Sequence, residues 1–214
     1  MKKNCVFFLL LMTIMPVFAQ EGFVFSKGIE KVTVPIVLIN NLVFIPIKVN
    51  GVELNFLLDT GVEETILFSL EDNPDVNFFN SEKISLRGLG SEEAIEGLKT
   101  TNNILELEGV KATRQLVYVI LDQSFNLSSQ IGIPVNGIIG YNFFRENLIR
   151  IDYASKRVIV YKDNVANRKK IEKRFDKATI TIDRFKPYLL GIADIDKVKV
   201  SVKMLIDTGN SDSV

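Results

Sequence analysis

Short apolar runs separated by polar turns occupy most of the chain. The clearest example is residues 42–49 (LVFIPIKV), which lead through Asn50-Gly51 into a second apolar run that ends at Leu58. Hydrophobic runs joined by Asn-Gly are typical of a β-hairpin. Further strands are expected within 105–110 and 115–121, with a closing hairpin at 148–161, whereas 141–147 has the pattern of a short helix. The pattern predicts an all-β chain, a closed or sandwiched barrel of short strands.

One stretch of this pattern occurs twice, as FLLDTG at 56–61 and as MLIDTG at 204–209. An apolar triplet of this kind is typical of a strand buried on both faces, and Asp-Thr-Gly is a turn that ends it. Each carboxylate is therefore expected where a core strand reaches the surface. A turn-capping role would suffice for either copy alone, but the pair together favours chemistry at Asp59, Thr60, Gly61, Asp207, Thr208 and Gly209.

The composition limits which chemistry is possible. Histidine is absent, and the only cysteine is Cys5. This composition excludes catalytic sites that require histidine. It also excludes thiolate nucleophiles and zinc sites built from histidine or cysteine. An enzyme of this composition has to transfer protons with carboxylates, lysine or tyrosine. No metal or organic cofactor is implied. The net charge of the 214 residues is zero, which argues against a nucleic acid partner.

The first nineteen residues have the pattern of a signal peptide. Lys2 and Lys3 precede an apolar run at 6–15, Pro16 interrupts it, and Ala19 stands where a signal peptidase would cut. A membrane anchor is the alternative, but the run is shorter than the roughly 18–20 apolar residues of a span. We expect cleavage after Ala19 and a secreted or periplasmic protein without a stable membrane span.

Two hydrophobic-hydrophobic-Asp-Thr-Gly segments in one chain resemble the aspartic peptidases. The first copy is similar to the retropepsin-like branch found in secreted bacterial proteins. The segment 136–144 resembles the hydrophobic-hydrophobic-glycine element that supports the catalytic loop in that family, here Ile138, Ile139 and Gly140. The resemblance covers about 31–161 and implies an acid-protease barrel lobe at 20–162. A basic linker at 163–177 and the start of a second, incomplete lobe at 178–214 would follow.

The resemblance also implies a mechanism. Asp59 and Asp207 would hold a water molecule between them, and Thr60 and Thr208 would form hydrogen bonds across the interface between the two loops. Two carboxylates about 3 Å apart cannot both ionise, as is established for aspartic proteases as a class. One acid then accepts a proton from the water while the other donates a hydrogen bond to the peptide carbonyl.

Three further segments have more than one interpretation. Gly88, Leu89 and Gly90 lie where the family has a mobile hairpin over the substrate, but Gly-x-Gly is also an ordinary turn. Residues 163–177 are rich in lysine and arginine, which fits a solvated connector better than a nucleic-acid patch. Val62, Glu63 and Glu64 replace the small and hydroxyl residues usual after the motif. The carboxylates of Glu63 and Glu64 could raise the pKa values of Asp59 and Asp207, disfavour acidic substrates or indicate an inactive lobe.

Together these features predict a secreted aspartic endopeptidase that acts on peptide or protein substrates. One alternative is a retropepsin-like homodimer with Asp59 contributed by each chain. Another is a catalytically silent domain that binds peptides or β-strands. The second copy breaks off soon after Gly209, so we expect the chain to be part of a longer, two-lobed protein.

Overall fold

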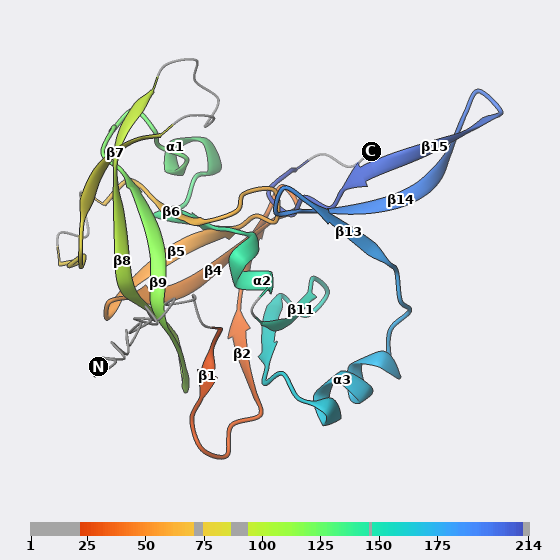
Figure 1. The fold of residues 1–214 in the computed structure, drawn as a ribbon, viewed down its shortest axis with the longest axis horizontal. Coiled ribbons are helices and arrows are strands. Elements are labelled where there is room, and N and C mark those ends of the chain that lie inside the picture. Colours follow the sequence, from red (N-terminus) through yellow and green to blue (C-terminus); the bar gives the residue numbers. More distant parts are fainter. Residues whose placement is uncertain (1–21, 71–74, 87–93, 146, 212–214) are drawn as a thin grey trace, which may run out of the picture.

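The computed structural model describes residues 22–70, 75–86, 94–145 and 147–211 (Figure 1). The predicted signal peptide, with its cleavage position at Ala19, lies outside the described residues. The predicted substrate hairpin at Gly88, Leu89 and Gly90 does so as well. Within the described ranges, no helix is long and apolar enough to cross a membrane.

The body of the molecule is a closed β-barrel. Its strands follow the order β9-β6-β10-β5-β4-β8, and the ring closes because β8 also pairs with β9. These strands are β4 (Leu42–Val49), β5 (Val52–Leu58), β6 (Thr65–Leu67), β8 (Ile95–Leu107), β9 (Val110–Ile120) and β10 (Gly137–Ile139). The prediction of an all-β chain with a barrel lobe is confirmed.

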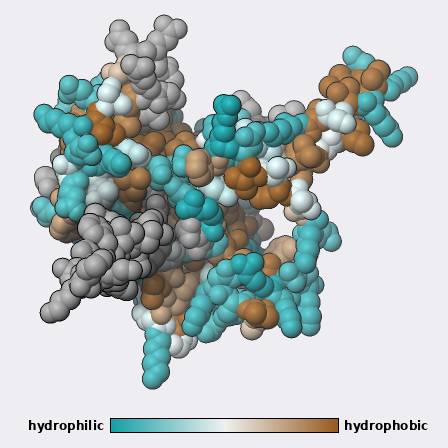
Figure 2. All heavy atoms as spheres, in the orientation of Figure 1, coloured by the Kyte–Doolittle hydropathy of each residue, from teal (hydrophilic) through white to brown (hydrophobic). Residues whose placement is uncertain are grey.

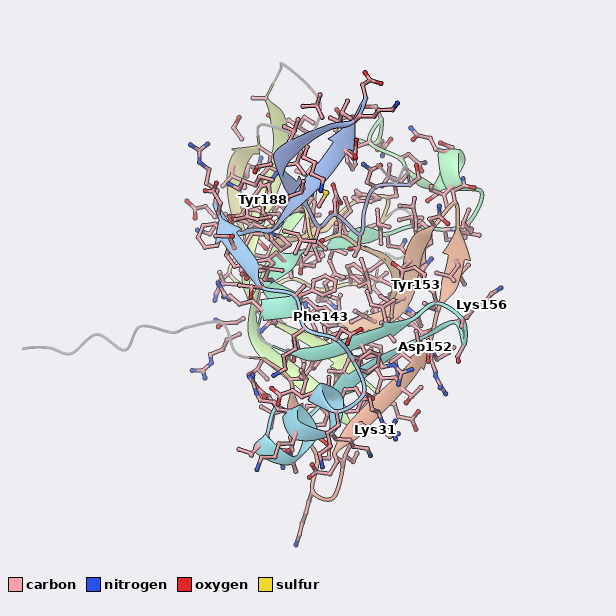
Figure 3. All side chains as sticks on the ribbon, turned by 90° about the vertical axis from the view of Figure 1, so that its right-hand side faces the viewer. Lys31, Phe143, Asp152, Tyr153, Lys156 and Tyr188 are labelled. Atoms are coloured by element: carbon pink, nitrogen blue, oxygen red, sulfur yellow. The ribbon has the colours of Figure 1, made fainter. Side chains whose placement is uncertain are left out.

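Shorter strands extend the barrel at its edges. β1 (Val24–Phe25) pairs with β9, β3 (Val37–Ile39) with β4, and β7 (Glu82–Leu86) with β8. A separate sheet has the order β11-β12-β2, built from β11 (Leu148–Asp152), β12 (Arg157–Tyr161) and β2 (Lys31–Pro35). The predicted hairpin at 148–161 is thus confirmed, and Asp152, Tyr153 and Lys156 mark its turn (Figure 3).

Two details of the predicted elements were wrong. The expected strand at 105–110 is broken by a hairpin turn at Glu108-Gly109, because Gly109 adopts a φ of +81° that favours glycine. The helix α1 (Ser128–Ile131) was not predicted. It is a single turn with no buried residue, so it leaves no apolar periodicity in the sequence. The expected helix at 141–147 is present as α2 (Tyr141–Arg145).

The core explains why the strands of the first hairpin are apolar at nearly every position. Val43, Ile45 and Ile47 point to one cluster, whereas Leu42 and Phe44 point to the other. β4 therefore buries both of its faces, as does the end of β5. Each Leu, Ile or Phe side chain buried in this way contributes about 1.5–3 kcal/mol to folding.

The second copy of the repeat forms a sheet that projects from the body. It contains β13 (Ile180–Asp183), β14 (Lys186–Ile195) and β15 (Val198–Leu205), paired in sequence order. Figure 1 shows β14 and β15 as an arm, and Figure 2 shows apolar residues on its surface. Leu190 and Ile192 are 67% and 72% exposed.

The prediction that 204–206 is a strand buried on both faces was wrong. Met204 and Ile206 are 37% and 38% exposed, whereas Phe56 and Leu58 at the equivalent positions are fully buried. The reason is that β5 has barrel strands on both sides, whereas β15 pairs with β14 alone among the described strands. An apolar run in the sequence indicates that burial of the strand is favourable, but it does not show whether other elements cover that strand.

Between the two copies lies the helix α3 (Val165–Glu172), whose described residues include none that is buried. It begins at Asn164, whose side chain accepts a hydrogen bond from the Asn167 amide. Two basic side chains here form ion pairs with acids, Arg168 with Asp163 and Lys177 with Glu172. These two cations are therefore paired with acids of the same segment.

Candidate active site

Asp59 stands at the end of a buried strand. The backbone N–H of Asp59 donates a hydrogen bond to the carbonyl of Ile139 at 3.0 Å. The carboxylate is held from its own turn, because the Gly61 N–H donates to Asp59 Oδ1 at 2.7 Å. Backbone and side chain of this residue are thus both fixed by the local fold.

The strand β10 supports this loop from within the barrel. It runs parallel to β5 and antiparallel to β6, the two strands that flank the loop. Ile138 and Ile139 are buried in the core. At Gly140 a Cβ atom would lie 2.4 Å from the carbonyl oxygen of Glu64 and 2.6 Å from that of Glu63. Only glycine allows the two backbones to approach so closely.

The Asp207 loop repeats the local geometry of the first. The Gly209 N–H donates to Asp207 Oδ1 at 2.9 Å, as Gly61 does for Asp59. Both aspartates are half-buried. The two loops therefore present their carboxylates in the same way, although one follows a buried strand and the other an exposed one.

Hydrogen bonds between the two threonines join the loops. The Thr60 N–H donates to Thr208 Oγ1 at 3.1 Å, and the Thr208 N–H donates to Thr60 Oγ1 at 3.2 Å. Each hydroxyl then donates to a carbonyl of the opposite chain segment, Thr208 to Leu58 at 2.9 Å and Thr60 to Ile206. The four bonds form an approximately twofold pattern around the junction of the loops.

The glycines bring each loop against the aspartate of the other. A Cβ atom at Gly209 would lie 2.2 Å from Asp59 Cγ, and one at Gly61 would lie 3.0 Å from Asp207 Oδ2. Each carboxylate thus sits directly over the backbone of the opposite glycine. This contact, together with the threonine bonds, brings the acids of residues 59 and 207 to one place.

The electrostatics of Asp59 follow from this placement. Burial raises the pKa of Asp59, the Gly61 amide lowers it, and the charge of Asp207 and a hydrogen bond to it raise it again, to about 6. Because removing a carboxylate from water disfavours its charged form, Asp59 retains its proton well above the usual range. Asp59 can therefore act as a proton donor in mildly acidic solution.

The sequence did not reveal the partner of Glu64. The side chain of Asn142 donates to Glu64 Oε2 at 2.7 Å, and Asn142 is only 4% exposed. Its one signal in the sequence is a polar residue within the apolar segment 138–144 (IIGYNFF). Buried polar side chains require partners, so such a residue marks a contact without identifying it.

No cluster of acidic side chains suited to a metal ion occurs among the residues that the structure describes. The predicted site residues thus fall into two sets. Asp59, Thr60, Gly61, Asp207, Thr208 and Gly209 meet at the junction of the loops, and Ile138, Ile139 and Gly140 lie directly behind the first of them.

Comparisons with known proteins give a likeness of fold to solved structures. No protein-family model and no curated protein sequence matches the chain. Among solved structures, the chain is similar to a retropepsin-like aspartic protease from Rickettsia conorii, with 16% sequence identity and a TM-score of 0.42. The match covers 61% of this chain and 89% of that one.

Proposed function

We propose that the protein is an aspartic endopeptidase that hydrolyses peptide bonds with a water molecule activated by Asp59 and Asp207. The observation that supports this most directly is the reciprocal bonding of Thr60 and Thr208. It holds two Asp-Thr-Gly loops face to face, and a turn-capping role for the acids requires no such contact between loops. No residue of the site other than the carboxylates is needed for proton transfer.

The reaction divides its roles between the two acids. Asp59, whose pKa is raised to about 6, carries the shared proton. Asp207 accepts a proton from the water as the water oxygen attacks the peptide carbonyl carbon, while Asp59 donates to the carbonyl oxygen. The tetrahedral intermediate then collapses, the C–N bond breaks, and the leaving amine takes up a proton from the dyad.

The homodimer that uses Asp59 from each chain is less compatible with this geometry. The loop at 206–209 already contacts the face of the Asp59 loop that a second copy would need. A second chain could bind there only after Thr208 and Gly209 were displaced. We therefore assign the partner carboxylate to the same chain.

We further propose that the enzyme is secreted or periplasmic and acts there on peptides or proteins. The support is the signal-like pattern of residues 1–19 in the sequence. Comparing the N-terminus of the exported protein with Ala19 tests this part independently of activity. A mature protein that still begins at Met1 would contradict it.

The test of the proposed activity is cleavage of an unfolded protein between about pH 3 and pH 7 by the wild type and by Asp59→Asn and Asp207→Asn. We expect each variant to lose at least about 100-fold in kcat, because an amide cannot exchange the proton. Asp194→Asn, at an exposed position of β14, is the matched control and should retain activity. A wild type that cleaves nothing, or an active Asp59→Asn, contradicts the proposal. Activity of the folded wild type that is lost in Asp59→Asn excludes a silent binding domain.

A further inference from the structure

The loop that follows Asp59 is attached to one short segment behind it. The backbone N–H of Asp59 donates a hydrogen bond to the carbonyl of Ile139 at 3.0 Å. In the other direction, the N–H of Tyr141 donates to the carbonyl of Val62 at 2.6 Å, and the N–H of Asn142 donates to that of Glu63 at 3.0 Å. This segment is the end of β10 and the start of α2, so the loop takes its position from the barrel interior.

A side-chain bond completes the attachment, from Asn142 Nδ2 to Glu64 Oε2. The Oδ1 atom of Asn142 is buried and has no hydrogen-bond partner within the described structure. Asn142 thus offers both a donor and an unused acceptor next to an ionisable side chain. Aspartate, which has nearly the same shape, offers acceptors alone when it is ionised.

Glu64 is surrounded by groups that influence its charge. Burial raises the pKa of Glu64, and the bond from Asn142 lowers it. Glu63 on the same loop raises this pKa, whereas Arg145 of α2 and Lys99 of β8 lower it. Tyr118 of β9 also interacts with these two acids. Burial raises the pKa of Tyr118, and the charges of Glu64 and Glu63 raise it further.

We propose that Asn142 is a positioning residue for Asp59, and that its amide holds the Asp59 loop in both charge states of Glu64. The ionised Glu64 accepts from Nδ2. A protonated Glu64 can instead donate to Oδ1 of Asn142 after the side-chain amide has rotated, so that Oδ1 and Nδ2 exchange places. The contact therefore persists while the dyad titrates, and the position of Asp59 does not depend on the charge of Glu64. This role rests on the proposed peptidase function.

The first test is the isosteric variant Asn142→Asp, assayed for kcat and KM from about pH 4 to pH 7. Two ionised carboxylates at this distance repel each other, whereas one protonated acid restores a hydrogen bond. We expect kcat near that of the wild type at about pH 4 and a loss of about tenfold or more at pH 7, with KM nearly unchanged. A loss of equal size at every pH, or no loss at all, overturns the proposal.

A double variant separates this pairing from general damage to the fold. In Asn142→Asp with Glu64→Gln, the new amide at 64 donates to the new carboxylate at 142, so the bond forms again with its direction reversed. We expect recovery of kcat at pH 7 to within about threefold of the wild type. Failure to recover overturns the proposal. Should the single variant not fold, Glu64→Gln alone decides, since its amide can still accept from Asn142 and kcat should be retained.

Amide hydrogen exchange gives a measurement that does not depend on activity. The amides of Asp59 and Asn142 report whether the loop remains attached to β10 and α2. We expect faster exchange in Asn142→Asp at pH 7 than at pH 4, after correction for the intrinsic pH dependence of exchange. If the wild type proves inactive while this pattern is found, the peptidase proposal fails and the attachment stands. Unchanged protection overturns the attachment itself.

Discussion

The hydroxyls of Thr60 and Thr208 each accept a hydrogen bond from the backbone amide of the other residue, at 3.2 and 3.1 Å. The two residues are 148 positions apart in the sequence. The bonds connect the barrel to the projecting sheet next to the two carboxylates. Because each hydroxyl also donates to a carbonyl, each threonine satisfies two backbone groups of the opposite segment.

The variant Thr60→Val tests this junction. Valine keeps the shape but leaves the Thr208 amide and the Ile206 carbonyl without partners, at a cost of about 1–3 kcal/mol for each buried group. We expect exchange of the Thr208 amide to become about tenfold faster or more, together with a loss of activity. Thr60→Ser keeps the hydroxyl and is the control. Equal exchange in the valine and serine variants would refute the role of the hydroxyl.

The glycines of the two motifs predict an asymmetry between the loops. A Cβ at position 209 would lie 2.2 Å from Asp59 Cγ, a distance that forces the carboxylate to move, whereas one at 61 would lie 3.0 Å from Asp207 Oδ2. We expect Gly209→Ala to reduce kcat by about 100-fold and Gly61→Ala by about tenfold or less. Kinetics of both folded variants provide the measurement. Equal losses would contradict the asymmetry.

The hairpin of β4 and β5 could be predicted because residues adjacent in the sequence determine it. Asn50 and Gly51 both adopt positive φ values, 50° and 91°, which their residue types favour, and the flanking runs are apolar enough to be buried on both faces. The support of the Asp59 loop by Ile138, Ile139 and Gly140 is not local, because β10 pairs with β5, which is far away in the sequence. It was expected only from the resemblance to the aspartic peptidases.

Other features depend on residues far away in the sequence and could not be predicted from local patterns. The amide of Asn142 meets Glu64 across 78 positions, and no period or spacing indicates that pairing. The exposure of Met204 likewise depends on what packs over β15, and not on its own side chain. The local sequence thus identified the two Asp-Thr-Gly loops, whereas the contacts that hold them depend on the three-dimensional fold.

Protonation of Asp59 predicts how stability changes with pH. The pKa of Asp59 in the folded protein, about 6, lies above its value in the unfolded chain, about 4. The folded state therefore binds the proton more tightly, so this stabilisation is complete below about pH 4 and is lost as the pH rises through about 6. Relative to Asp59→Asn, the free energy of unfolding of the wild type should fall over that interval. Urea denaturation at several pH values measures it, and a constant difference would contradict the raised pKa.

The contact of Gly140 with the Asp59 loop predicts that Gly140→Ala disrupts the barrel. The new Cβ would lie 2.4 Å from a backbone oxygen of Glu64, so the loop or β10 has to shift, and we expect a loss of about 2–4 kcal/mol in the free energy of unfolding. Gly191→Ala is the matched control, because its Cβ would approach the flexible end of Met204, at 2.9 Å, which can rotate away. Gly191 is partly exposed in β14, so its substitution should be neutral or slightly stabilising. Urea denaturation of both variants gives the comparison. Equal stability of the two would mean that the barrel absorbs the shift, and that β10 does not fix the position of the loop.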